Sequence, residues 1–500
     1  MASPRPRSRS SALRLTTAAA ALLSLARPVA GFNCSQPPIY VDIHSRVTSP
    51  KAEFLYGSFI GLGSPAQNQS LWPSLSQNET SFAARSFCER SAVADCERVE
   101  GGNVDGNLST TWKTDEDYRP RDARRDALYG TDTLHLYTHY FDPSPAWQTS
   151  LENFTTSLVN SGSSRPGIVG IGSQSTLLAR LYQLGLIAGR TYSLYIGSGM
   201  DRAGGTVNGS NVFGGYDSGR FKGPVHTYPM DLKSADYLPV TVADIVLEDA
   251  AHGLGKRSIM NGGVPFEARI TTDQYPMRLP AGVTRNFADL LEGEASGESD
   301  GSLMLQKPFN GSMTIRLSDG FSVTLPADVV RNASNLSPVE QAQNANYTGP
   351  YYLSTAWLSE VYLMLDFEGA QFHLAQALPH GKYVMPRTFC PNSVPVPYGY
   401  RTGISRFVAT GMIGAVIGGV IGGIALVLAV LAVCVVWRRE KARKRAETEW
   451  MAVGGGEKPR RGFLGIGRRR GGQDVEMRDV GAEKLRKGSS DSDFTTHSRR

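Results

Sequence analysis

The residue patterns that most often mark a metal or a cofactor site occur in this chain only in incomplete form. His135 and His139 are spaced to share one face of a strand, but no third metal ligand lies within sequence reach. Residues 61–66 (GLGSPA) formally fit a dinucleotide-binding GxGxxA pattern, which requires a helix to begin there. Pro65 and the polar, β-rich sequence after it do not supply that helix. Residues 297–301 (GESDG) match GxSxG, but they belong to an Asp-, Glu-, Gly- and Ser-rich surface loop and not to the strand-to-helix elbow that a serine hydrolase needs, so we expect no metal, no cofactor and no serine hydrolase.

Five cysteines limit the disulfides that the chain can form. Cys434 lies within a long apolar run and is expected to stay unpaired. The other four allow three connectivities. Cys88 and Cys96 are close enough in sequence to close a small loop, and Cys34 would then pair with Cys390. So few bridges in a chain of this length mean that a buried core must hold the fold.

Ten Asn-x-Ser/Thr sequons all precede the apolar run and predict a glycosylated ectodomain. They lie at Asn33, Asn68, Asn78, Asn107, Asn153, Asn208, Asn310, Asn332, Asn335 and Asn346.

The two ends of the chain predict a single-pass type I protein of the plasma membrane with an extracellular ectodomain. Residues 1–30 combine five arginines with a short apolar run, as a cleaved secretory signal peptide does. Residues 407–437 carry no charge and are long enough to cross a bilayer as a helix. The six basic residues within 438–445 would stop transfer and stay in the cytosol.

Charge is distributed unevenly along the chain. The tail, 438–500, has 18 basic and 10 acidic residues, whereas the whole chain has a net charge of only +6, which leaves the ectodomain acidic. An acidic ectodomain argues against nucleic acid as a partner. The basic tail is expected to be disordered and attracted to anionic inner-leaflet lipid. Glycines at 414, 418 and 422 repeat every four residues, so the span could also support a homodimer.

Between these ends the sequence is typical of an all-β protein. Short apolar alternations such as 133–140, 312–317 and 361–367 are separated by Gly, Pro, Asn and Asp. One stretch instead has the spacing of an amphipathic helix, from Thr176 to Leu184, with Gly185 placed to end it.

Five segments of this β-rich region, taken in order, resemble motifs of the pepsin-like aspartic peptidases, especially their glycosylated, membrane-anchored fungal members. The segments are 56–67 (YGSFIGLGSPAQ), 167–172 (GIVGIG), 213–221 (FGGYDSGRF), 266–280 (FEARITTDQYPMRLP) and 356–375. The resemblance implies a bilobal ectodomain, with an N-terminal lobe over 38–200 and a C-terminal lobe over 201–380. A juxtamembrane linker would follow over 381–406.

The same resemblance locates two catalytic loops but not the catalytic residues. The family's chemistry needs two carboxylates that share one proton. The family's spacing from Gln67 puts Ser74 at the first aspartate position, and the residue after Ile270 puts Thr271 at the second. Hydroxyl groups do not ionise at any pH where proteins fold, so neither replaces a carboxylate. Asp273 stands two residues later, at a loop-glycine position, and we expect it to point elsewhere.

These departures favour a cell-surface binding or sensing protein over a peptidase. The cleft between the lobes would then bind an extended peptide or glycan. Two alternatives stay open: an active aspartic endopeptidase with an atypical dyad that acts on surface proteins, and a structural, wall-associated glycoprotein.

Overall fold

The computed structural model describes residues 32–47, 54–92, 95–118, 120, 124–138, 148–162, 165–198, 207–260, 262–344, 346–380, 383–399 and 412–452. The predicted signal peptide and tail residues 453–500 lie outside the described residues. The chain divides into two compact units, 1–400 and 401–500.

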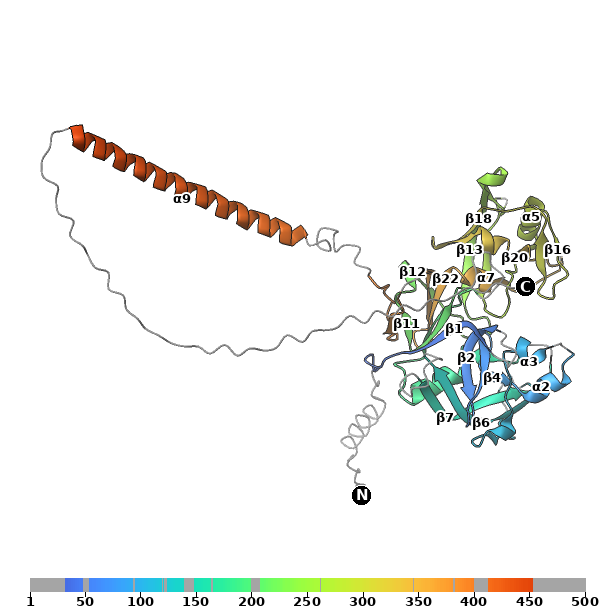
Figure 1. Ribbon diagram of the computed structural model, residues 1–500. Coiled ribbons are helices and arrows are strands. Elements are labelled where there is room, and N and C mark those ends of the chain that lie inside the picture. Colours follow the sequence, from blue (N-terminus) through green and yellow to red (C-terminus); the bar gives the residue numbers. More distant parts are fainter. Residues whose placement is uncertain are drawn as a thin grey trace, which may run out of the picture. The chain divides into compact units, whose positions relative to one another are not determined.

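The first unit is built on a thirteen-stranded sheet that takes strands from both halves of the sequence (Figure 1). In spatial order the strands are β12 (Phe221–Pro229), β23 (Gln371–Ala377), β22 (Val361–Asp366), β9 (Thr191–Tyr195), β10 (Gly209–Phe213), β1 (Ile39–Val47), β2 (Phe54–Leu62), β3 (Gln67–Ser74), β8 (Ile168–Gly170), β4 (Ser81–Ala83), β7 (Gln148–Val159), β6 (Ala127–Tyr137) and β5 (Lys113–Thr114). Because β9 pairs with both β10 and β22, the sheet joins the two halves into one body.

The C-terminal half adds three smaller sheets. One contains β19 (Ser322–Pro326), β18 (Ser312–Leu317), β13 (Pro239–Asp249), β15 (Phe266–Ile270) and β21 (Tyr351–Leu353), with β14 (Leu254–Ser258) paired to β13. The others contain β16 (Gly293–Ala295), β17 (Ser302–Leu305) and β20 (Leu336–Glu340), and β11 (Gly215–Asp217) with β24 (Pro386–Thr388). The body is therefore mostly β, as the short alternating segments predict.

Alternating apolar residues account for the core. In β18, Met313, Ile315 and Leu317 are buried, and the residues between them are more exposed. This period of two puts one face of the strand against the interior. The main buried cluster runs through both halves of the unit, and Trp357 is its largest fully buried side chain.

Short helices connect the strands. They are α2 (Arg85–Arg90), α3 (Cys96–Val99), α4 (Thr176–Gln183), α5 (Ala281–Leu291), α6 (Ala327–Val330) and α7 (Thr355–Leu358), together with the 3₁₀ turns η1 (Gly106–Leu108) and η3 (Ala250–His252). Helix α4 lies where helical spacing predicts it. The Ser175 hydroxyl accepts the backbone N–H of Leu178, and Gly185 follows the helix with a φ of +68°.

Both disulfides, Cys34–Cys390 and Cys88–Cys96, join the pairs that sequence spacing indicates. The expected linker at 381–406 differs from the structure over residues 383–399, which belong to the first unit. Strand β24 pairs with β11 there, and Phe389 is fully buried. The burial of Phe389 and a short strand pairing thus hold on the first unit a segment that the resemblance implied would be a linker.

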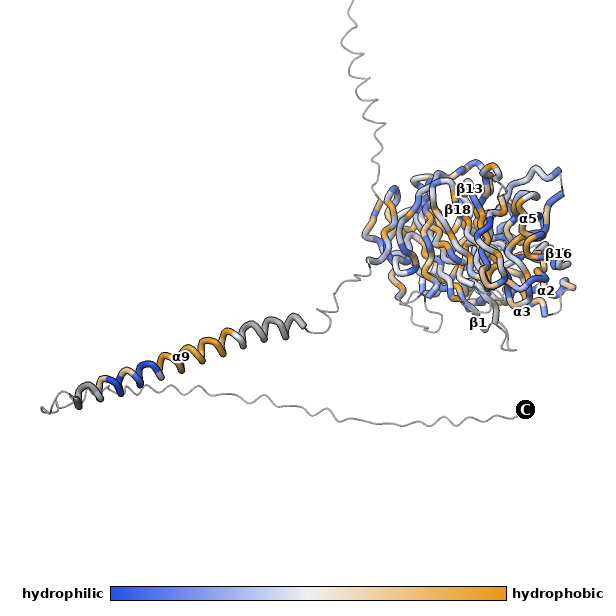
Figure 2. The backbone as a smooth tube through the Cα atoms, turned by 90° about the horizontal axis from the view of Figure 1, so that it is seen from above, coloured by the Kyte–Doolittle hydropathy of each residue, from blue (hydrophilic) through white to orange (hydrophobic). Residues whose placement is uncertain are grey.

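The second unit contains helix α9 (Met412–Ala452), and residues 422–446 are long and apolar enough to cross a membrane. The helix continues past Trp437, where we expected a disordered tail to begin. Residues 438–452 are rich in Arg, Lys, Glu and Ala, which favour helix, so no residue there ends it. Figure 2 shows α9 changing from hydrophobic to hydrophilic along its length. Cys434 is unpaired.

Candidate functional site

Two loops, one from each half of the body, each follow a strand that is paired in parallel with a neighbouring strand. Strand β3 ends at Ser74 and runs parallel to β8, while β15 ends at Ile270 and runs parallel to β21. The residue after β15, Thr271, donates its backbone N–H to the carbonyl of Leu353 in β21 at 3.0 Å. Strand pairing therefore fixes the backbone on which Ser74 and Thr271 lie.

Hydrogen bonds connect the loop after β3 to the loop after β15. The indole N–H of Trp72 donates to the Thr272 carbonyl at 2.8 Å, and the backbone N–H of Leu75 donates to the Thr272 hydroxyl at 3.1 Å. Thr272 is 1% exposed, so these bonds are shielded from water. The Leu75 side chain has no hydroxyl, so it cannot form the matching hydrogen bond to the backbone of the second loop.

Asp273 lies between Ser74 and Thr271, contrary to the expectation that it would point elsewhere. The Ser74 hydroxyl donates to one carboxylate oxygen at 2.6 Å, and the Thr271 hydroxyl donates to the other at 3.3 Å. The backbone N–H of Asp273 also donates to the Thr271 hydroxyl at 3.1 Å. This local turn brings the aspartate side chain back over the threonine, which sequence spacing alone does not reveal.

The chemistry of this site rests on one carboxylate and two hydroxyls. Ser74 and Thr271 are buried, whereas Asp273 is exposed, so the carboxylate is the group that solvent or a ligand meets. A proton-sharing dyad needs a second carboxylate within hydrogen-bond reach. Among the described residues, the groups that donate to Asp273 here are hydroxyls. The arrangement can accept hydrogen bonds from a ligand but lacks a paired acid.

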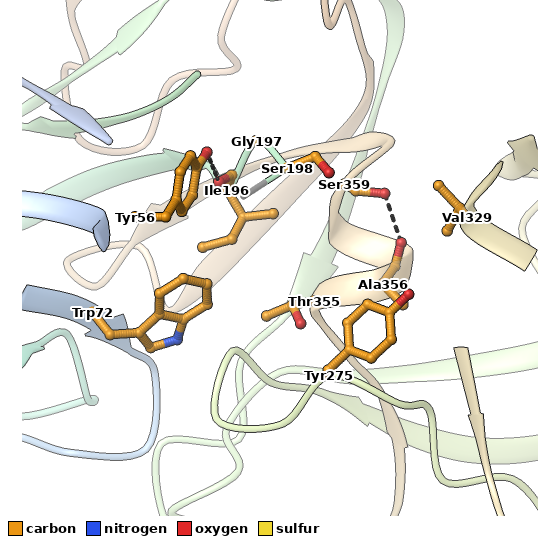
Figure 3. Close-up of a pocket in the computed structure, with 10 residues that line it drawn as sticks. All are labelled: Tyr56, Trp72, Ile196, Gly197, Ser198, Tyr275, Val329, Thr355, Ala356 and Ser359. Carbon is orange, nitrogen blue, oxygen red and sulfur yellow. Dashed lines mark hydrogen bonds between the residues drawn. The ribbon is translucent and has the colours of Figure 1, made fainter. Parts of the chain in front are cut away.

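A mostly apolar pocket lies beside these loops (Figure 3). Tyr56 and Trp72 come from the N-terminal half, and Tyr275 and Thr355 from the C-terminal half. The cavity volume is about 20 Å³, which is room for about one water molecule. It is lined by Tyr56, Trp72, Ile196, Gly197, Ser198, Tyr275, Val329, Thr355, Ala356 and Ser359.

Sequence reasoning missed two residues beside the loops. Tyr237 is buried and donates its hydroxyl to the Ile171 carbonyl at 2.7 Å. Burial, followed by the negative charge of Asp273, raises the pKa of Tyr237, so it stays a neutral donor. Arg165 places its guanidinium 4.9 Å from the centre of the Trp72 ring. Its position just before the GIVGIG segment was the only signal in the sequence.

A second, polar hollow of about 220 Å³ adjoins the first loop at Gln77. The Tyr118 hydroxyl donates there to Glu79 at 3.1 Å, and the Thr176 hydroxyl donates to the other oxygen of Glu79 at 3.3 Å. Burial, together with the Glu79 charge, raises the pKa of Tyr118 to about 12. Arg124 also lines this hollow. Carboxylate, amide, guanidinium and phenol groups thus face one space.

The remaining sequence candidates lie elsewhere. His135 has ring nitrogens near the Gly63 carbonyl and the Ser150 hydroxyl, while His139 lies outside the described residues. In the part of the chain that the structure describes, no group of three or more His, Cys, Asp or Glu side chains could hold a metal ion.

The sequon asparagines differ in accessibility. The exposed ones are Asn33, Asn107, Asn153, Asn208, Asn310 and Asn346, and the half-buried ones are Asn68, Asn78 and Asn335. Asn332 is buried, and its side-chain oxygen accepts the backbone N–H of Leu336 at 2.8 Å. A sequon alone does not predict this burial.

A mostly β body with paired strand-end loops meeting at Trp72, Ser74 and Thr271–Asp273 is the arrangement expected for the pepsin-like class. The family model described as Eukaryotic aspartyl protease matches residues 148–377. The fold and this match together support the pepsin-like eukaryotic aspartyl protease family for this chain. The matched range includes Thr271 and Asp273 but begins after Ser74.

A relative of known name is similar over a shorter stretch. Rhizopuspepsin-5 from Rhizopus niveus is 31% identical over 130 residues, which is 24% of this chain and 29% of that protein. The chain thus spans less than a third of the relative's length.

Proposed function

We propose that this protein is a membrane-anchored, cell-surface glycoprotein whose pepsin-like ectodomain binds ligands without cleaving peptides. One observation carries the proposal. The Ser74 and Thr271 hydroxyls both donate to the single carboxylate of Asp273, and by our sequence-based assignment these two residues take the positions where the family's mechanism needs carboxylates. A lone carboxylate cannot be the ionised base and the protonated acid at the same time.

The space around the loops supports an extended ligand. The half-buried rings of Trp72 and Tyr275 beside the small apolar pocket would pack against a hydrophobic side chain or the face of a sugar ring. Asp273 is exposed and would accept a hydrogen bond from a backbone N–H or a sugar hydroxyl. The ligand class we propose is therefore a peptide or a glycan, held by shape and hydrogen bonds.

Several features support the proposed location. The disulfides suggest passage through the secretory pathway, and α9 could anchor the chain in a membrane. We propose a type I orientation in the plasma membrane, with the sequons outside and the basic cluster that begins at Arg438 against anionic inner-leaflet lipid. The glycines spaced by four in 414–422 would permit a homodimer.

One observation favours a second candidate, an aspartic endopeptidase with an atypical centre. The carboxylate of Asp273 reaches the meeting point of the two loops, where the Ser74 oxygen lies 2.6 Å away. In that case Asp273 would act as the base, and a group supplied by the substrate would have to replace the missing acid.

Peptide cleavage by the purified full-length chain in detergent separates the two candidates. We expect no cleavage of a mixed peptide library, analysed by mass spectrometry, between about pH 3 and pH 7, the range over which a carboxylate pair works. A statine-type inhibitor should bind weakly, because its hydroxyl would meet one carboxylate rather than two. The matched variant is Asp273→Asn. Cleavage by the native chain that disappears in Asp273→Asn would refute the binding-only proposal and establish the second candidate.

A further inference from the structure

A patch of exposed apolar side chains lies at the C-terminal end of the first unit. Tyr383, Val384, Val394 and Val396, here called the juxtamembrane patch, are 57%, 47%, 55% and 58% exposed. Among the described residues of this unit, eleven large apolar side chains are exposed, and these four fall within the short segment 383–399. Scattered exposed apolar residues need no explanation, but a local concentration marks a contact surface.

The patch is held rigidly on the body. The backbone N–H of Met385 donates to the carboxylate of Asp217 at 2.7 Å, and that of Val396 donates to the Tyr216 hydroxyl at 3.3 Å. Both runs of the patch are therefore bound to the same strand, β11, and the Cys34–Cys390 disulfide is attached between them. These bonds hold Met385 and Val396, and with them the neighbouring residues of the patch, on the first unit.

The chemistry of segment 383–399 suits a lipid surface. It contains no acidic residue and one basic residue, Arg387, whose guanidinium lies 5.9 Å from the ring of Tyr398. Tyrosine is enriched where membranes meet water, and arginine can extend its charge to lipid phosphates. Little charge would have to be desolvated if this face contacted a bilayer.

The length of the connecting chain limits how far the patch can lie from the membrane in which we propose that α9 is anchored. Only residues 400–411 separate the described part of the first unit from the start of α9 at Met412. Twelve residues span at most about 40 Å. The tether gives the patch a high effective concentration at the bilayer, so even a weak intrinsic affinity would keep it bound.

We propose that the juxtamembrane patch rests on the outer surface of the lipid bilayer that α9 crosses. This inference depends on the membrane anchoring proposed above. Docking would restrict how the ectodomain tilts over the membrane, and it would therefore fix the direction in which the ligand-binding loops face.

A fluorescent label at position 396 tests the proposal in the full chain. Val396→Cys in a Cys434→Ala background is labelled with an environment-sensitive dye and reconstituted in phosphatidylcholine vesicles. Val264→Cys is the matched control, because Val264 is 84% exposed and belongs to the same unit. We expect shallow spin-labelled lipid to quench the label at 396 by about twofold and to leave the label at 264 nearly unquenched. Adding Val394→Asp should abolish most of this quenching.

Each other outcome would overturn the proposal in a recognisable way. Equal, weak quenching at both positions in chains that resist alkaline extraction would refute docking while leaving the anchor intact. Chains extracted by alkaline carbonate would refute the anchor, and the docking with it. A dye shift at position 396 that needs several copies per vesicle and is insensitive to spin-labelled lipid would show that a second copy of the chain covers the patch.

Discussion

Replacing His373 with glutamine should remove most of the acid sensitivity of the ectodomain between pH 7 and pH 5. His373 lies in the middle of β23 and is fully buried. One ring nitrogen, Nδ1, is 2.8 Å from the Thr227 hydroxyl, while the other has no hydrogen-bond partner among the described residues. Burial lowers the pKa of His373 to about 4, and nearby Asp366 offsets this effect in part.

The direction of the pH effect follows from this lowered pKa. An unfolded histidine titrates near pH 6.5, so between that pH and about 4 the unfolded chain binds a proton that the folded chain excludes. The stabilising effect is complete above pH 6.5 and is lost as the pH falls toward 4. The loss amounts to about 2 kcal/mol between pH 7 and pH 5, and to about 3 kcal/mol in all. Asp217, whose pKa is raised by burial, acts in the opposite direction.

Urea unfolding of the full chain in detergent micelles, followed by tryptophan fluorescence, measures this effect. The native chain should show a lower midpoint at pH 5 than at pH 7, and His373→Gln should show a much smaller difference. The same change at the exposed His380 controls for the loss of a histidine. If His373→Gln retains the native difference, or if the native chain is equally stable at both pH values, the argument is wrong. Should His373→Gln fail to fold, NMR titration of the His373 ring in the native chain gives the same answer.

Three other expectations are open to direct measurement. Ser74→Asp would place a second carboxylate against Asp273, raising the pKa of one of them. The variant should therefore lose at least about 1 kcal/mol relative to the native chain as the pH rises from 5 to 7, in urea unfolding at each pH. Replacing Cys34 and Cys390 by serine opens a loop with a sequence separation of 356, and should cost roughly 5 kcal/mol, about twice the cost of removing the shorter disulfide. Glycopeptide mass spectrometry should find Asn332 unmodified, because its side chain is buried and hydrogen-bonded, while the sequon three residues later carries glycan.

The features that the sequence predicts well are those set by local pattern. Alternating apolar residues indicate strands such as β18, and helical spacing together with Gly185 indicates α4. The second long helix of the body, α5 (Ala281–Leu291), was missed. Its buried side chains are Val283, Thr284, Phe287 and Leu291, and the glycine and threonine in its sequence weaken the helical signal.

The features that the sequence does not reveal depend on contacts between distant segments. Asp273 was expected to point away, because its displacement by two residues is visible in the sequence but the turn made by Thr271 is not. Phe389 and β24 were assigned to a linker, because their partner, β11, lies about 170 residues earlier in the chain. In both cases the position of the segment is set by hydrogen bonds to a particular backbone or hydroxyl group, which the local sequence does not reveal.

The contacts that hold the two loops in place do not depend on which side chains occupy positions 74 and 271. The loop backbones are fixed by strand pairing and by the contacts of Trp72 and Leu75 with Thr272, none of which requires a carboxylate at position 74 or 271. A hydroxyl there can donate and accept hydrogen bonds, but its charge does not change with pH. Among the described residues, Asp273 is the carboxylate that contacts both Ser74 and Thr271, and a carboxylate in this position can orient a ligand through hydrogen bonds. This is the physical basis of our proposal that the site binds a ligand without the paired acid and base that peptide cleavage in this class requires.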